Sequence, residues 1–176
     1  MSEGDRDRDP HQYIYTPALE DRAAELLRNA EKRRLRIASA ESCTGGALAA
    51  LLTDVEGLSH VFERGYVVYN DAAKEECLGI DSSLIETRGA VSKEVAAEMA
   101  RGALSRSGAD IAIGITGNAG PAGPDDEEGL VCIAAASREG LPKLQSHHFG
   151  AIGRAGVRIR ALQAALDLLN DTIGKT

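Results

Sequence analysis

Residues 35–52 read LRIASAESCTGGALAALL. The short alternating segment from Leu35 to Ala40 predicts a β-strand, and the small apolar residues from Ala47 to Leu52 predict a helix. The polar segment 41–46, ESCTGG, therefore lies on a strand-to-helix turn. A strand that leads through a short turn into a helix is the repeating unit of α/β proteins.

The same order of elements recurs along the chain. Further strands are predicted over residues 65–69, 109–115, 130–136 and 143–149. Further helices are predicted from residue 18, after Asn70 as N-cap, after Ser92 as N-cap and over residues 157–169. Strands that alternate with helices predict an α/β sandwich with a mostly parallel sheet and an antiparallel part near the C-terminus.

Length and composition favour one globular domain. The chain has 176 residues, of which 43% are hydrophobic and 27% charged, which is ordinary for such a domain. We expect a single domain over residues 15–176. Residues 1–14 alternate Asp and Arg without an apolar period, so we expect a mobile N-terminal arm there.

The charge balance argues against a nucleic-acid partner. The chain carries 20 Lys and Arg residues against 27 Asp and Glu residues, a formal net charge of -7. Its aromatic side chains, 2 Phe and 4 Tyr with no Trp, are too few for a base-stacking platform. The sequence therefore predicts that nucleic acid is not the partner.

Cysteine use and hydropathy bear on location. Cys43, Cys77 and Cys132 stand far apart without a C-x-x-C pair, so a reducing compartment and no disulfide framework are expected. No apolar run approaches ~18 residues, and the start is too polar for a signal peptide. We therefore predict a cytoplasmic protein without a membrane partner. The small apolar residues 47–52 also suit packing between two copies, so a homo-oligomer stays open.

Three polar or glycine-rich segments follow predicted strands. They cover residues 41–46, 69–74 and 116–121. In open α/β sheets, ligands bind beyond the carboxyl ends of the strands. We therefore expect one cleft that collects groups from all three segments.

The ESCTGG segment places candidate nucleophiles beside glycines. Ser42, Cys43 and Thr44 precede Gly45 and Gly46, which lack a Cβ and let a substrate approach backbone N–H groups. The turn could supply a nucleophile and an oxyanion site together. Two alternatives stay open: Ser42 or Thr44 simply caps the following helix, or the Cys43 thiol is the nucleophile.

Tyr69 and Lys74 lie five residues apart, across a strand end and a helix start. The positive end of the helix dipole disfavours an ammonium ion, and dehydration in a cleft favours the neutral amine. A neutral Lys74 can remove the proton of a serine hydroxyl, and Ser42 is the first candidate. The alternative is that Lys74 pairs with Asp71 or with an exposed Glu.

The C-terminal half adds further candidate groups. Thr116, Gly117 and Asn118 begin the segment TGNAGP, which could present a hydroxyl and backbone amides to a carboxamide, a phosphate or an oxyanion. The segment could equally be only a tight turn. Arg154, Arg158 and Arg160 open the last helix, where arginine suits a phosphate, with a solvated basic face as the alternative.

No metal site is expected. His147 and His148 are neighbours in a predicted strand and therefore point to opposite faces, and no Cys or carboxylate stands at ligand spacing. The acidic run 125–128 has no paired-acid geometry and predicts a solvated loop.

Five stretches of the chain occur in a recognisable order and at compatible spacing. They are AESCTGG at 40–46, FERGYVVYNDAAK at 62–74, LGI at 78–80, RGAVS at 88–92 and TGNAGP at 116–121. On these stretches the chain resembles the CinA C-terminal domain family over about residues 17–170. The family includes stand-alone nicotinamide-nucleotide amidases, and no molybdopterin-binding-like domain precedes the stretches, so we expect a stand-alone amidase.

The resemblance implies a fold, an activity and a set of site residues. The fold is a three-layer α/β/α domain. The activity is hydrolysis of the carboxamide of nicotinamide mononucleotide to nicotinate mononucleotide and ammonia, in pyridine nucleotide salvage, without a metal or organic cofactor. The catalytic residues would be Ser42 as nucleophile, Lys74 as base and Tyr69. Substrate-binding groups would come from Thr44, Gly45, Gly46, Thr116, Gly117, Asn118 and Arg154.

Departures from the family pattern leave other functions open. Asn118 stands where the family usually has isoleucine, and the loop from Pro121 to Gly129 is shorter than usual. The approach to Arg154 is slightly longer. The alternatives are a non-catalytic nucleotide-binding or interaction domain of the same fold, and an amidase for another small amide.

Overall fold

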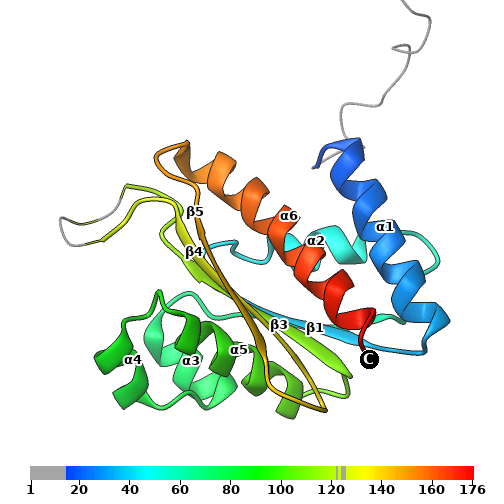
Figure 1. The fold of residues 1–176 in the computed structure, drawn as a ribbon, viewed down its shortest axis with the longest axis horizontal. Helices are drawn as coiled ribbons and strands as arrows, with labels where there is room; N and C mark the ends of the chain where they lie inside the picture. Colours follow the sequence, from blue (N-terminus) through cyan, green and yellow to red (C-terminus); the bar gives the residue numbers. More distant parts are fainter. Residues whose placement is uncertain (1–14, 122, 124–125) are drawn as a thin grey trace, which may run out of the picture.

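A computed structural model describes residues 15–121, 123 and 126–176. The arm predicted for residues 1–14 lies outside the described residues. Figure 1 shows one twisted sheet between two layers of helices. The elements in chain order are α1 (Pro17–Lys32), β1 (Ile37–Glu41), α2 (Ala47–Thr53), β2 (Phe62–Val67), α3 (Asp71–Leu78), α4 (Ser82–Arg88), α5 (Lys93–Ser105), β3 (Ile111–Gly117), β4 (Leu130–Ser137), β5 (Lys143–His148) and α6 (Gly153–Ile173).

The sheet has the strand order β2-β1-β3-β4-β5. β1 lies between β2 and β3 and is parallel to both. β4 is antiparallel to its two neighbours, β3 and β5. The predicted α/β sandwich, with parallel strands and an antiparallel C-terminal part, is confirmed.

Helices cover both faces of this sheet. α1, α2 and α6 pack together over one face, while α5 lies on the other face with α3 and α4 beside it (Figure 1). The three layers are therefore helix, sheet and helix, as the family resemblance implied. In the part of the chain that the structure describes, no helix combines the length and the apolar character needed to cross a membrane.

Side-chain size differs between the two faces of the sheet. In β3, Ile113 and Ile115 point into the core under α1 and α6, whereas Ala112 belongs to the core under α5. Gly114 shares the face of Ala112, and a Cβ at Gly114 would lie 2.2 Å from the carbonyl oxygen of Ala96 in α5. Small residues on this face therefore let α5 approach the sheet backbone closely.

Most element ends follow local signals in the sequence. The side chains of Asn70 and Ser92 cap α3 and α5, and Gly79 ends α3 with a φ of 69°. Sequence analysis missed α4, because Ile85 is its one buried residue and no apolar stripe marks the helix. β2 begins at Phe62, earlier than predicted.

A buried carboxylate joins β1 to α2. Glu41 is fully buried at the end of β1. It accepts hydrogen bonds from the backbone N–H groups of Gly46, Leu48 and Ala49, at 2.8–3.1 Å, and from the Ser39 hydroxyl at 3.2 Å. These N–H groups belong to the start of α2, which has no other side-chain cap. Glu41 therefore caps this helix, and the alternative that Ser42 or Thr44 does so is wrong.

Replacement of Glu41 by glutamine tests this cap. The amide nitrogen of Glu41→Gln cannot accept a hydrogen bond, so two of the four donors lose their acceptor in a buried site. We expect the free energy of unfolding in urea to fall by about 2 kcal/mol or more. The matched change Glu75→Gln, on the exposed side of α3, should shift it by less than about 0.5 kcal/mol. Equal urea midpoints for Glu41→Gln and the wild type would contradict the assigned role.

Candidate active site

A pocket of about 230 Å³ opens at the carboxyl ends of β1 and β3. It is lined by Ser42, Cys43, Tyr69, Asp71, Lys74, Ala90, Val91, Thr116, Gly117, Ala119 and Arg154. The three polar segments that follow predicted strands thus meet in one pocket, and the start of α6 contributes Arg154. This is the edge of an α/β sheet at which ligands are generally bound.

The predicted site residues divide into two groups. Those that line the pocket are Ser42, Tyr69, Lys74, Thr116, Gly117 and Arg154. Those that lie in adjoining turns, outside the lining, are Thr44, Gly45, Gly46 and Asn118. Asn118 bridges the two sides of the β3–β4 loop. Its side-chain amide donates to the Glu127 carbonyl (3.2 Å), and its backbone N–H donates to the Leu130 carbonyl (2.8 Å).

Ser42 is held by its backbone at the start of the ESCTGG turn. Its N–H donates to the carbonyl of Ile115 in β3 (2.9 Å), and its carbonyl accepts from the N–H of Gly45 (3.0 Å). The side chain is 7% exposed. Among the described residues, none makes a hydrogen bond to the Ser42 hydroxyl, which leaves Oγ accessible to a ligand in the pocket.

Lys74 is a buried cation on the first turns of α3. Only 1% of the residue is exposed, and its amine makes a 3.1 Å contact with Oδ1 of Asp71, one turn earlier in the helix. Both features weighed from the sequence are thus present, burial in the cleft and a pair with Asp71.

Three further side chains surround this pair. Tyr69, which follows β2, is 62% exposed and stands at the rim of the pocket. Thr116 is buried and donates its hydroxyl to the carbonyl of Ala90 (2.7 Å), so that its lone pairs can still accept a hydrogen bond. Arg154 lies across Gly120, where a Cβ would stand 2.6 Å from the guanidinium Nη2.

Cys43 has the wrong environment for a nucleophile. Burial raises the pKa of its thiol to about 12. The reactive form of cysteine is the thiolate, which such a shift makes scarce near neutral pH. Of the two neighbouring candidates, Ser42 is therefore the better one.

Two contacts that hold the ESCTGG turn were missed from the sequence. The first is the Glu41 cap, for which an acidic residue shortly before a helix start is a usable signal. The second is Arg158, whose Nε donates to the Cys43 carbonyl (2.8 Å) across 115 positions of sequence. Arg158 does not line the pocket. No local pattern could have paired Arg158 with the ESCTGG turn.

The two histidines of β5 have partners other than a metal. His147 bonds to Gln145 and stacks on Phe149, and burial lowers its pKa. His148 pairs with Glu127. Within residues 15–121, 123 and 126–176, no group of three His, Cys, Asp or Glu side chains is arranged to hold a metal ion.

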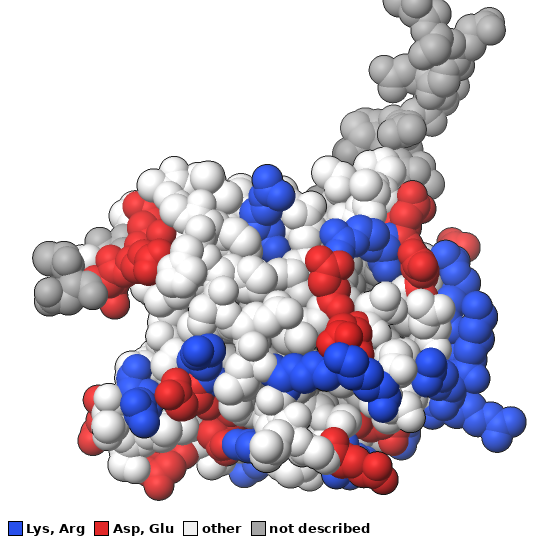
Figure 2. Space-filling view, in the orientation of Figure 1, with Lys and Arg blue, Asp and Glu red and all other residues white. Residues whose placement is uncertain are grey.

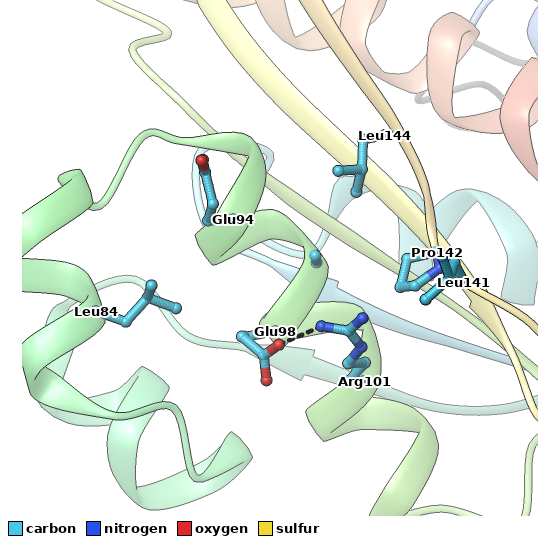
Figure 3. A pocket seen from close by; sticks show the side chains of 8 residues that line it. Leu84, Glu94, Glu98, Arg101, Leu141, Pro142 and Leu144 are labelled. Carbon is cyan, nitrogen blue, oxygen red and sulfur yellow. Dashed lines mark hydrogen bonds and ion pairs between the residues drawn. The ribbon is translucent and has the colours of Figure 1, made fainter.

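A larger pocket, of about 390 Å³, lies between α4, α5 and the segment that leads into β5 (Figure 3). Leu84, Leu141 and Leu144 form its apolar walls, and Glu98 pairs with Arg101 within it. Its described lining residues include no serine, cysteine or lysine. It therefore offers no nucleophile, and the pocket around Ser42 is the candidate active site.

Local charge at this pocket differs from that of the whole chain. The chain has a net charge of -7, but Lys74 and Arg154 face the pocket with Asp71 as the single lining carboxylate. Charges of both signs are spread over the face seen in Figure 2, with basic side chains along the edge where α1 ends. The pocket can therefore attract an anionic ligand to an acidic protein.

Comparison with known sequences identifies the family. The family model for the CinA C-terminal domain matches residues 19–173. A CinA-like protein of Chlorobaculum tepidum is 48% identical over 140 residues, which are 77% of this chain and 33% of that protein. A CinA-like protein of Mycolicibacterium vanbaalenii is 43% identical over 168 residues, 93% of this chain and 38% of that protein. The chain spans about a third of the length of these curated relatives.

Solved structures show the same fold over nearly the whole chain. The competence/damage inducible protein CihA from Agrobacterium tumefaciens has a TM-score of 0.88 and 36% identity, covering 92% of this chain and 99% of that one. A CinA superfamily protein from Klebsiella pneumoniae has a TM-score of 0.84 and 31% identity, covering 90% and 99%. The chain therefore belongs to the CinA C-terminal domain family.

Proposed function

We propose that this domain is an amidohydrolase that converts nicotinamide mononucleotide and water to nicotinate mononucleotide and ammonia. One observation carries the proposal: a serine with an unengaged hydroxyl and a buried lysine line the same small pocket, at the carboxyl end of the sheet. A serine needs a base to become a nucleophile, and lysine can act as that base when it is neutral. The identity of the substrate is inferred from the amidases whose motifs the sequence around both residues resembles.

The first half of the proposed reaction forms an acyl-enzyme. Lys74 accepts the proton of the Ser42 hydroxyl while Oγ forms a bond to the carboxamide carbon, and the carbonyl electron pair moves onto oxygen. When that pair returns, the carbon–nitrogen bond breaks and the ammonium of Lys74 gives its proton to the leaving nitrogen, so that ammonia departs. Asp71 stabilises the ammonium form that exists between these two transfers.

The second half of the reaction repeats these steps with water as the nucleophile. A water molecule loses a proton to Lys74 and attacks the acyl carbon, and collapse breaks the bond to Oγ. The proton returns to Ser42, and the carboxylic acid product then ionises. The overall change is one water consumed and one ammonia released, so no redox partner is required.

The surrounding groups suit orientation of the substrate. Thr116 can accept a hydrogen bond from the carboxamide nitrogen, and Tyr69 stands where it can contact the pyridine ring or relay a proton. Gly117 lines the pocket at a position where a Cβ would lie 2.6 Å from the Leu130 carbonyl oxygen, and Asn118 holds the adjoining loop. Arg154, which lines the pocket, would bind the phosphate, and binding energy from that remote group would help to orient the amide.

Ammonia release from nicotinamide mononucleotide tests the proposal directly. We expect Ser42→Ala and Lys74→Met to lower the rate by at least about a thousandfold, because each removes half of the nucleophile–base pair. Lys93→Met removes an exposed lysine at the start of α5 and should retain wild-type activity. A wild type whose melting temperature rises with the nucleotide but which releases no ammonia would instead be a nucleotide-binding domain.

Alkylation of cysteines tests the choice of nucleophile. With iodoacetamide at pH 8, the folded protein should be labelled at the exposed Cys77 and not at Cys43 or Cys132, since both of these are buried and burial raises the pKa of each. Unfolding in urea should make all three reactive, as measured by peptide mass spectrometry. Fast labelling of Cys43 in the folded protein would restore it as the competing nucleophile.

Substitution of Arg154 tests recognition of the phosphate. We expect Arg154→Ala to lower kcat/KM for nicotinamide mononucleotide by about 10- to 100-fold, the value of a charge-assisted hydrogen bond. Nicotinamide riboside lacks the phosphate, so its slower hydrolysis should be insensitive to the substitution. Arg160→Ala, on the same helix and exposed, is the control. An equal loss with both substrates would show that Arg154 does not bind the phosphate.

A further inference from the structure

Two successive backbone N–H groups follow the candidate nucleophile. They belong to Cys43 and Thr44, and within the described residues no oxygen atom accepts a hydrogen bond from either of them. The neighbouring N–H groups are all engaged: Ser42 donates to Ile115, Gly45 donates to Ser42, and Gly46 donates to the Glu41 carboxylate. Both N–H groups lie near the thiol of Cys43. Adjacent N–H groups without an oxygen acceptor form a concave site for an anionic oxygen.

The carbonyl groups of the same two peptide units are held by protein donors. The Ser42 carbonyl accepts from Gly45 (3.0 Å), and the Cys43 carbonyl accepts from Nε of Arg158 (2.8 Å). A peptide unit is planar and trans, so its C=O and N–H point in opposite directions. A donor that fixes the Cys43 carbonyl therefore also fixes the direction of the Thr44 N–H.

The guanidinium of Arg158 lies against the turn without entering the pocket. Its Nη2 is 3.1 Å from where a Cβ would be at Gly45, a residue with a φ of 63°. Cys43 lines the pocket and Arg158 does not. The Cys43 carbonyl is thus held toward Arg158, and the Thr44 N–H of the same peptide unit points the opposite way.

We propose that the backbone N–H groups of Cys43 and Thr44 form the oxyanion site, and that Arg158 is the positioning residue that orients them. The assignment deepens the proposed amidase function and rests on it for the substrate. When Oγ of Ser42 attacks the carboxamide, the oxygen that gains negative charge is bound by these two donors. Arg158 touches neither the substrate nor Ser42 Oγ, so its effect passes through the peptide unit between Cys43 and Thr44.

This arrangement predicts a kinetic signature. A group that orients oxyanion donors stabilises the transition state and not the bound amide, so its loss lowers kcat and leaves KM nearly unchanged. A residue that only supports the fold would instead lower the melting temperature and raise KM as well. Arg158→Lys keeps a donor for the Cys43 carbonyl and should retain more activity than Arg158→Met.

Two readouts separate this proposal from the proposed function. The first is ammonia release from nicotinamide mononucleotide, as kcat and KM. The second is the rate at which a fluorophosphonate labels Ser42. In this reaction the hydroxyl proton passes to Lys74, Oγ bonds to phosphorus, fluoride leaves, and the oxyanion site binds the phosphoryl oxygen. Both are measured on wild type, Arg158→Met and Arg158→Lys, with Arg160→Met as the matched exposed arginine and Ser42→Ala as the unlabelled reference.

We expect Arg158→Met to lower both kcat and the labelling rate by about 10- to 100-fold, with an intermediate value for Arg158→Lys and wild-type rates for Arg160→Met. Wild-type rates in a folded Arg158→Met would overturn the role of Arg158. If Arg158→Met does not fold, Arg158→Lys is compared with the wild type instead. A lower kcat at unchanged KM in Arg158→Lys supports the role, and a raised KM at unchanged kcat overturns it. Labelling of wild-type Ser42 without ammonia release would refute the nicotinamide substrate alone, whereas a wild type inert in both assays would refute both proposals.

Discussion

The structure around the pocket depends on one buried carboxylate. Glu41 ends β1 without exposure to solvent, and its charge is compensated by N–H groups at the start of α2 and by the Ser39 hydroxyl. A buried carboxylate without such donors is strongly unfavourable. The same set of hydrogen bonds therefore joins the end of the strand, the turn and the first turn of the helix. Ser42 lies within this unit, so the same interaction that closes the fold places the candidate nucleophile.

Close packing on the other face of the sheet determines the position of Lys74. α5 approaches β3 at Gly114, and α3 approaches α5 at Gly102, where a Cβ would lie 2.5 Å from the carbonyl oxygen of Leu78. Both contacts require a residue without a side chain. Lys74 occupies the buried side of α3, so these small residues set how near its amine comes to the carboxyl ends of the strands. The packing of the fold and the geometry of the candidate site are thus decided by the same positions.

The chemistry proposed for the pocket depends on the charged groups that line it and not on the net charge of the chain. An acidic chain offers two cations here, one buried on α3 and one exposed at the start of α6. The buried amine lines the same pocket as the Ser42 hydroxyl, which suits it to accept that proton in the proposed reaction. The exposed cation suits a phosphate, because it can exchange water for an anion at little desolvation cost. Backbone N–H groups complete the set without adding any charge.

Much of this could be read from the sequence, and the limits have a physical origin. Alternation, caps and glycines are local signals, so the amino-acid sequence by itself determined the α/β class, the caps at Asn70 and Ser92, and the segments that would face a ligand. The helix α4 was not predicted, because its short, exposed turns have no apolar period. Only the tertiary structure decided that Lys74 is buried and paired, that Glu41 and no hydroxyl caps α2, and that Arg158 holds the Cys43 carbonyl across 115 positions. Burial and long-range hydrogen bonds depend on which elements pack together, and no spacing within one segment encodes that.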